Sequence, residues 1–179
     1  MKKIGFIGVG IMGKSMVRNL MKTGYELHIY ARTKAKVDDV ISEGAIFHES
    51  IKECVPGCDA VITIVGFPRD VEEVYFDEGG ILENADPGTY LIDMTTTSPK
   101  LDQQIYEEAK KRGLHGLDAP VTGGDSRIPE QKTLHYPSLS AARKKIMKLV
   151  WSFSKQWEQT SIIREKPDVD SMQSLLIRL

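Results

Sequence analysis

The sequence predicts an α/β fold in which a mainly parallel, doubly wound sheet is covered by helices on both faces. Two observations support this prediction. Short apolar runs rich in β-branched residues alternate with amphipathic helical runs from residue 3 to about residue 118, and the glycine-rich turn GVGIMG joins the first strand to the first helix. Strands that alternate with helices form parallel sheets, because a parallel return needs a crossover connection. We expect this fold over residues 1–125 only.

Five strands and four helices account for this alternation. Apolar runs predict strands at 3–7, 26–30, 60–64, 90–93 and 114–118. Apolar residues spaced three or four apart predict helices at 11–22, 34–42, 69–75 and 100–112. Ser98 and Pro99 are typical of a helix start, with a capping residue followed by proline, and glycines at 24, 44 and 113 are typical of helix ends.

Composition and charge are those of an ordinary soluble protein. Hydrophobic residues make up 41% of the chain, charged residues 27%, and the net charge is −1. No run approaches the roughly 20 apolar residues of a membrane span, and the start of the chain lacks the pattern of a signal peptide. We therefore expect a cytoplasmic protein that binds neither membranes nor nucleic acid. Cys54 and Cys58 lack partner ligands, so we expect two reduced thiols and no metal site.

The glycine-rich turn predicts a phosphate-binding site. Gly8, Gly10 and Gly13 follow a strand and open a helix, in the spacing G-x-G-x-x-G. Gly8 permits the tight turn, Gly10 lets a pyrophosphate approach the backbone, and Gly13 allows the helix to pack closely on the strand. The exposed N–H groups of the turn, including those of Ile11 and Met12, and the helix dipole would bind the phosphate charge. The alternative is a purely structural glycine turn.

The end of the second strand favours NADP over NAD as the cofactor. An NAD site carries Asp or Glu about 20 residues after the glycine motif, where it holds the ribose hydroxyls. This chain instead has Ala31, Arg32, Thr33 and, three residues later, Lys36. An arginine suits a 2′-phosphate, because its planar guanidinium binds phosphate in a bidentate manner. Two alternatives stay open: Arg32 only stacks on the adenine, or the chain binds NAD.

Four ordered motifs resemble the β-hydroxyacid dehydrogenases, the family of 3-hydroxyisobutyrate dehydrogenase and tartronate semialdehyde reductase. They are GFIGVGIMGKSMVRNL, YARTKAK, IDMTTTSP and DAPVTGG, and they lie between residue 1 and about residue 126. The resemblance implies a Rossmann-type cofactor domain. It places Thr96 near the nicotinamide, and Val65, Gly66 and Phe67 in the segment that covers the cofactor. It also places Thr122, Gly123 and Gly124 against the substrate carboxylate.

The resemblance implies reversible hydride transfer between NADP and a small β-hydroxyacid or the matching semialdehyde. Such chemistry needs a general acid/base beside the carbinol oxygen. The family uses a lysine for this, in a pattern like G-x-x-G-x-G-x-x-x-K-x-x-N on a helix beyond the cofactor domain. This sequence has no such stretch, so we expect no catalytic residue in the chain as written. The family's helical second domain, and with it the oligomer interface, is also missing.

The character of the sequence changes near residue 126. All 15 glycines fall between Gly5 and Gly124, although a segment as long as 126–179 should hold about four at the average usage of roughly 7%. The same segment carries ten Lys/Arg against five Asp/Glu and both tryptophans, Trp151 and Trp157. A shift of reading frame after Ser126 explains such a change.

Reverse translation supports the frameshift hypothesis. Permitted codons for 156–179, read with the first two letters removed, give MGTNINHKGKAGCGQHAKLANQI, which resembles the missing lysine motif. We therefore expect 126–179 to be an out-of-frame, poorly ordered tail with at most a helix over 139–155.

Two readings of the chain's function remain. In the first, the chain descends from an NADP-dependent dehydrogenase and is catalytically incomplete. In the second, it is a dinucleotide-binding module without catalysis, in which the basic amphipathic segment 141–157 serves as an interaction helix.

Overall fold

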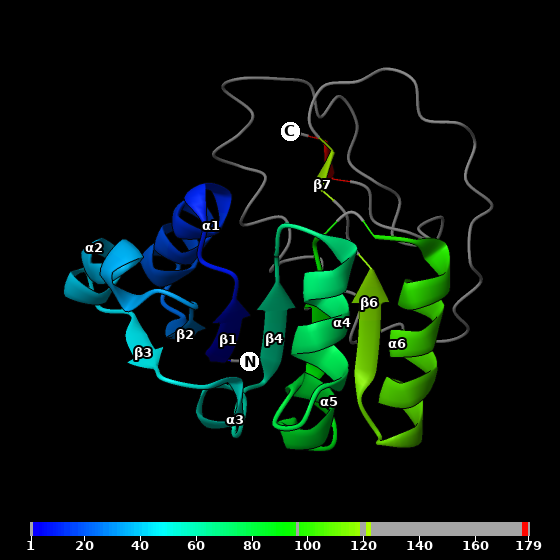
Figure 1. The fold of residues 1–179 in the computed structure, drawn as a ribbon. Helices are drawn as coiled ribbons and strands as arrows, with labels where there is room; N and C mark the ends of the chain where they lie inside the picture. Colours follow the sequence, from blue (N-terminus) through cyan, green and yellow to red (C-terminus); the bar gives the residue numbers. More distant parts are fainter. Residues whose placement is uncertain (1, 96, 119–120, 123–176, 179) are drawn as a thin grey trace.

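A parallel six-stranded sheet forms the centre of the molecule in the computed structural model, which describes residues 2–95, 97–118, 121–122 and 177–178 (Figure 1). The strand order is β3-β2-β1-β4-β5-β6, and every neighbouring pair is parallel. The strands are β1 (Lys3–Ile7), β2 (Glu26–Tyr30), β3 (Ile46–His48), β4 (Ala60–Thr63), β5 (Tyr90–Asp93) and β6 (His115–Asp118). The predicted α/β fold with a doubly wound parallel sheet is confirmed.

Helices connect the strands, and three of them begin and end close to the helices predicted at 11–22, 69–75 and 100–112. The helices are α1 (Ile11–Lys22), α2 (Asp38–Ser42), α3 (Ile51–Cys54), α4 (Pro68–Phe76), α5 (Ile81–Asn84) and α6 (Pro99–Lys111), with a 3₁₀ turn η1 (Lys34–Lys36). At the start of α6 the Ser98 Oγ accepts a hydrogen bond from the Leu101 N–H at 3.3 Å. The glycine after this helix, Gly113, has φ of 72°, so both ends of α6 are as predicted.

The helix expected over 34–42 is the main difference in secondary structure. It is divided into η1 and α2 by Val37, whose φ of −124° lies outside the helical region. The Val37 side chain is fully buried in the core. Burial of this side chain therefore accompanies the break, which the apolar spacing alone did not indicate.

Two hydrophobic layers lie on opposite faces of the sheet. On one face Ile4 and Phe6 of β1 pack with α1 and α2. On the other face Ile7 packs with residues of α3, α4, α5 and α6. This alternation along β1 follows the period of two in a strand, and it explains why both faces of the sheet are apolar.

The strand order places a possible ligand site between β1 and β4. The chain runs outward from β1 to β2 and β3, and then returns to β4 on the other side of β1. The connections after β1 and β4 therefore leave in opposite directions and open a crevice at the carboxyl ends of these strands. Ligands of open α/β sheets bind in such a crevice.

Residues beyond β6 contribute a second, two-stranded parallel sheet. It pairs β7 (Val121–Thr122) with β8 (Ile177–Arg178). The helix expected over 139–155, and the proposed tail apart from β8, lie outside the described residues. Among the helices that are described, none is both long enough and apolar enough to cross a membrane.

Candidate functional site

The turn after β1 requires glycine at two positions. Gly8 has φ of +93°, and a Cβ atom there would lie 2.1 Å from the carbonyl oxygen of Ile64. A Cβ atom at Gly13 would lie 2.5 Å from the carbonyl oxygen of Gly8. Both contacts are with backbone and far below van der Waals distance, so no larger residue fits without moving β1, β4 or α1. Gly8 thus forms the tight turn, and Gly13 allows α1 to approach the strand.

Gly10 differs from these two glycines because nothing lies within 4 Å of the position of its missing Cβ atom. It is the N-cap of α1, and its backbone is extended, with φ of −81° and ψ of −162°. No side chain caps the helix, and its first turn contains no acidic residue. The N–H groups and positive dipole end of α1 are therefore available to an anion.

A cavity of about 410 Å³ opens beside this helix terminus. It lies at the carboxyl ends of β1, β2 and β4, where the strand order reverses. Its volume falls in the range of cofactor and small-molecule sites. The residues that line it are Ile7, Gly8, Val9, Gly10, Tyr30, Ala31, Arg32, Thr33, Lys36, Ile64, Val65, Gly66, Asp70 and Val74.

Arg32 crosses from the end of β2 to α4 and forms two ion pairs there. Its Nη2 donates to Asp70 Oδ1 at 2.7 Å and to Glu73 Oε2 at 3.1 Å. These contacts, the Asp70 hydrogen bond foremost, raise the pKa of Arg32 above its usual value. The Arg32 side chain is still 59% exposed, so its guanidinium is partly neutralised and yet accessible from the cavity.

Asp70 has two hydrogen-bond partners, the Arg32 guanidinium and the Phe67 N–H. The second oxygen of Asp70, Oδ2, accepts the N–H of Phe67 at 3.1 Å and so closes the first turn of α4. Lys36 is exposed and forms no ion pair with the described residues. The cavity therefore contains two basic side chains and one carboxylate, a combination that suits a ligand with more than one phosphate group.

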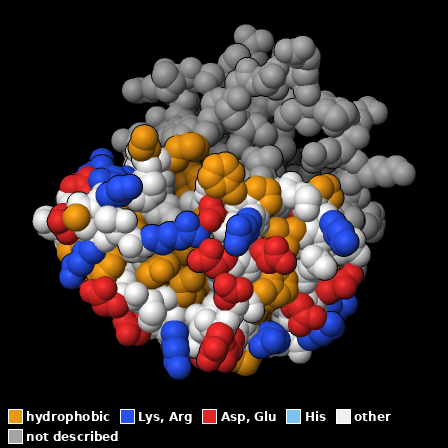
Figure 2. All heavy atoms as spheres, viewed as in Figure 1, with side chains coloured by type: hydrophobic (Ala, Val, Ile, Leu, Met, Phe, Trp, Pro, Cys, Tyr) orange, Lys and Arg blue, Asp and Glu red, His pale blue; other side chains and the backbone are white. Residues whose placement is uncertain are grey.

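The cavity brings together eight of the residues predicted to bind the cofactor. They are Gly8, Gly10, Ala31, Arg32, Thr33, Lys36, Val65 and Gly66. Gly13 is buried below the turn, Met12 is half-buried, and Ile11 and Phe67 are 93% and 71% exposed. None of these four lines the cavity. Hydrophobic side chains gather along the upper edge of the described part in Figure 2.

Four predicted residues remain, one assigned to the nicotinamide and three to the substrate carboxylate. Thr96, Gly123 and Gly124 lie outside the described residues. Thr122 is described as part of β7, which pairs with β8. Their roles toward nicotinamide and substrate remain predictions.

Sequence reasoning missed the contribution of α4 to the site. Asp70 and Val74 line the cavity, and Asp70 stands 38 positions after Arg32 in the chain. No local pattern indicates a contact over that separation. The only available signal was the position of Asp70 in the first turn of a helix, where an acid is common for helix-dipole reasons alone.

Cys54 and Cys58 are free thiols, as predicted. Both are buried, and burial raises the pKa of Cys54 to about 12 and that of Cys58 to about 11. The thiols therefore stay protonated and unreactive near neutral pH. Within the described part of the chain, no group of three or more His, Cys, Asp or Glu residues is arranged to hold a metal ion.

Comparison with known sequences finds a family match over most of the chain. The family described as the NAD binding domain of 6-phosphogluconate dehydrogenase matches residues 3–157. The chain is 51% identical over 124 residues to an uncharacterized oxidoreductase, YkwC, of Bacillus subtilis, a match that covers 69% of this chain and 43% of that protein. It is 40% identical over 124 residues to the NAD-dependent L-serine dehydrogenase of Pseudomonas aeruginosa, covering 69% and 42% of the two chains.

Comparison with solved structures agrees with the sequence matches. The 3-hydroxyisobutyrate dehydrogenase of Mycobacterium tuberculosis, solved with L-serine, has a TM-score of 0.64 and 31% identity, over 69% of this chain and 42% of that chain. The chain thus spans less than half the length of these relatives.

Proposed function

The chain belongs to the family of the NAD binding domain of 6-phosphogluconate dehydrogenase, and from this premise we propose that it binds NADP in the cavity between β1, β2 and β4. The observation that carries the proposal is the combination of an uncapped helix N-terminus with Arg32 and Lys36 in one cavity of about 410 Å³. NAD is the alternative cofactor at the same site.

Different residues of the cavity would bind different parts of the cofactor. The N–H groups at the start of α1 would bind the pyrophosphate, which reaches the backbone because Gly10 has no side chain. Arg32, Thr33 and Lys36 would bind the adenosine 2′-phosphate at the end of β2. The other half of the dinucleotide then extends past β4 toward β5, where Val65 and Gly66 form the cavity wall.

We further propose that the parent activity is hydride transfer to or from a small β-hydroxyacid or its semialdehyde. Relatives named as 3-hydroxyisobutyrate dehydrogenases and as an L-serine dehydrogenase support this substrate class. The cofactor supplies the hydride chemistry when it is bound, and the protein holds it and excludes water. Thr122, Gly123 and Gly124 are the residues proposed to bind the substrate carboxylate.

The chain as written is proposed to bind the cofactor without turning over substrate. The glycine turn and Arg32 are present, whereas these 179 residues contain no stretch like the lysine motif of the resembled family. We attribute this to a frameshift after Ser126. The family match continues to residue 157, beyond that point, so the nucleotide sequence at the codons for Gly124–Arg127 is the direct test of the frameshift.

The first prediction concerns cofactor preference. We expect the chain to bind NADPH more tightly than NADH, and Arg32→Ser to remove most of the difference. A lost charge-assisted phosphate contact costs roughly 1.5–3 kcal/mol, or about tenfold or more in affinity. Fluorescence titration with both cofactors measures the ratio. The matched control is Arg69→Ser, an exposed arginine of α4 that does not line the cavity; equal affinities in the parent chain would contradict the NADP assignment.

A second prediction follows from the acids that hold Arg32. Replacing Glu73 with Gln removes a negative charge 3.1 Å from the Arg32 Nη2 atom, so the guanidinium becomes more available to a 2′-phosphate. NADPH affinity should rise about threefold, in line with the ~0.2–1 kcal/mol of exposed ion pairs, while NADH affinity stays unchanged. Glu72→Gln on the same helix, with the same change in net charge, is the control. An equal gain in both variants would show a general charge effect and no competition at Arg32.

A further inference from the structure

Two loops meet at the carboxyl ends of β4 and β5, on the side of the cavity away from Arg32. The strands end at Thr63 and Asp93, which are partners in the parallel register. Val65, two residues after the end of β4, lines the cavity. The position of the loop after β4 therefore determines the shape of the cavity wall.

A buried hydrogen-bond network centres on Asp93, which is only 4% exposed. Its Oδ1 accepts hydrogen bonds from Thr63 Oγ1 and from the Thr95 N–H, both at 2.9 Å. Thr63 Oγ1 also lies 3.0 Å from the Tyr75 hydroxyl oxygen. A threonine hydroxyl has one proton to donate, so the Tyr75 hydroxyl donates to Thr63 when Thr63 donates to Asp93.

Thr95 connects this network to the cavity wall. Its Oγ1 accepts the N–H of Val65 at 3.1 Å, and Thr95 is itself only 5% exposed. Asp93 orders the backbone of Thr95, and Thr95 in turn orders the backbone of Val65. One buried carboxylate thus fixes the loop after β5 and, through it, the loop after β4.

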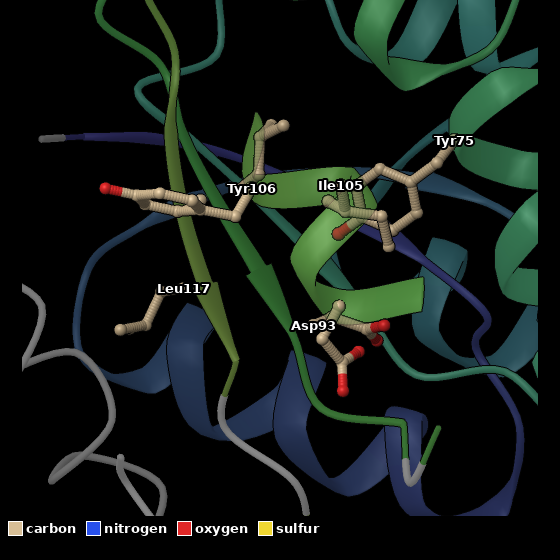
Figure 3. A pocket seen from close by; sticks show the side chains of 8 residues that line it. Tyr75, Asp93, Ile105, Tyr106 and Leu117 are labelled. Atoms are coloured by element: carbon tan, nitrogen blue, oxygen red, sulfur yellow. The ribbon is translucent and has the colours of Figure 1, made fainter. Parts of the chain in front are cut away.

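The second carboxylate oxygen has a different environment. Asp93 Oδ2 is buried without a hydrogen-bond partner among the described residues. Asp93 is one of the residues that line a pocket of about 10 Å³, about the space that one water molecule requires. Figure 3 shows Asp93 at this pocket with Tyr75, Ile105, Tyr106 and Leu117 around it. Oδ2 can therefore carry a proton while Oδ1 keeps its two hydrogen-bond donors.

The surroundings favour such a proton. Burial raises the pKa of Asp93 to about 6, against hydrogen bonds from Thr95 and Thr63 that lower it. Asp102 of α6 adds negative charge near it. The other titratable groups at the pocket are the hydroxyls of Tyr75 and Tyr106, so no described cation faces Asp93 there.

We infer that Asp93 is a positioning residue for the cofactor site: its carboxylate holds the Val65 wall through Thr95, and protonation loosens that wall. The inference rests on the proposed dinucleotide site. An ionised acceptor forms hydrogen bonds about twice as strong as a neutral one, so a neutral Asp93 holds the Thr95 N–H more weakly. Cofactor affinity should therefore fall as the pH is lowered through about 6.

The first test reads the network directly, without cofactor. We expect the amide resonance of Val65 in a ¹⁵N-labelled full chain to shift between pH 7.5 and pH 5, with a midpoint near 6. In Asp93→Asn, which imitates the protonated carboxyl, this titration should vanish. The comparison between parent and variant removes the contribution of any other group that changes its protonation over this range. A Val65 resonance that titrates equally in both proteins would overturn the inference.

The second test measures binding of NAD⁺ by calorimetry. This cofactor is chosen because it lacks the 2′-phosphate, whose own pKa is near 6. Asp93→Asn should bind NAD⁺ about three- to tenfold more weakly than the parent at pH 7.5, and its affinity should not change further at pH 5.

The stability of the same variant separates positioning from a merely structural role. The folded pKa of Asp93 is raised above its unfolded value of 3.8. The folded state therefore loses stability as the pH rises from about 4 to 6, and above 6 it contains a desolvated carboxylate. Asp93→Asn should consequently have a higher Tm than the parent at pH 7.5 while it binds more weakly. A loss of both stability and affinity would indicate a structural role only and would overturn the inference.

A second variant and a control complete the design. Thr95→Val keeps the side-chain shape but removes the acceptor for the Val65 N–H, so it should weaken NAD⁺ binding as Asp93→Asn does. Thr89→Val removes another buried hydroxyl, which bonds the Cys58 carbonyl at 3.0 Å far from the cavity, and should leave binding unchanged. Equal affinities for all four proteins would contradict the inference. Absence of NAD⁺ and NADPH binding by the parent would instead refute the proposed function. The Val65 amide titration would then still show whether protonation of Asp93 changes the environment of the Val65 backbone.

Discussion

Restoring the alternative reading frame after Ser126 should produce an active NADP-linked dehydrogenase, whereas the 179-residue chain should stay near background. By the proposed assignment, the chain as written has the cofactor cavity, but its 179 residues contain no stretch like the lysine motif of the resembled family. General acid/base catalysis commonly contributes about 10²–10⁴-fold in rate, and a closed site that holds nicotinamide and substrate in contact contributes further. One assay of NADPH formation with a panel of small β-hydroxyacids compares the two proteins.

A lysine variant of the restored protein provides the control for this experiment. With the codons chosen for the reverse translation, a lysine codon of the restored frame spans the codons for Gln173 and Ser174. Replacing that lysine with methionine should abolish turnover and leave NADPH binding intact, since the residue is expected to act as the acid/base alone. Normal turnover by the 179-residue chain would contradict both the frameshift hypothesis and the assignment of this lysine.

Substitutions at two glycines of the same turn should affect different properties: stability at Gly8 and NADPH binding at Gly10. Gly8→Ala forces a side chain into a positive-φ position, with its Cβ atom 2.1 Å from the Ile64 carbonyl oxygen. We expect it to lower the free energy of unfolding by about 2–4 kcal/mol, from backbone strain and from displacement of β4. Gly10→Ala places its Cβ atom in open space at an ordinary φ of −81°. We expect it to leave stability unchanged and to weaken NADPH binding about tenfold or more, because the methyl group occupies the approach of the pyrophosphate.

Thermal unfolding and NADPH titration of the two variants distinguish these effects. Each variant is the control for the other, since both add one methyl group to the same turn. A Gly10→Ala protein that binds NADPH as the parent does would show that the pyrophosphate does not lie against this turn.

The sequence predicted those parts of the fold that depend on local patterns. The strands β1, β2 and β5 have the expected bounds, because their apolar runs are bounded by helices and turns. The short elements β3, α3 and α5 were missed. They have three or four residues each, too few for a hydrophobic period, and tertiary packing determines their conformation.

The residues of the site likewise fall into those that local sequence patterns predict and those that depend on contacts between distant elements. Gly8, Gly10 and Arg32 were predictable because a turn and a strand end are local features, and all three line the cavity. Asp70 and Asp93 were not, since their roles depend on partners in other elements: Arg32 for Asp70, and Thr63 for Asp93. A single sequence contains no record of which strands become neighbours in the sheet.

Equilibrium titration of the unmodified 179-residue chain with NADPH tests the central claim most directly. Nicotinamide fluorescence or calorimetry gives both the stoichiometry and the affinity, at pH 7.5 and low ionic strength. We predict saturable binding of one NADPH per chain, with affinity that falls as salt is added, because phosphate contacts with Arg32, Lys36 and the start of α1 dominate the interaction. Absence of saturable binding, or binding that persists unchanged in Gly10→Ala, would contradict the assignment of this cavity as the dinucleotide site.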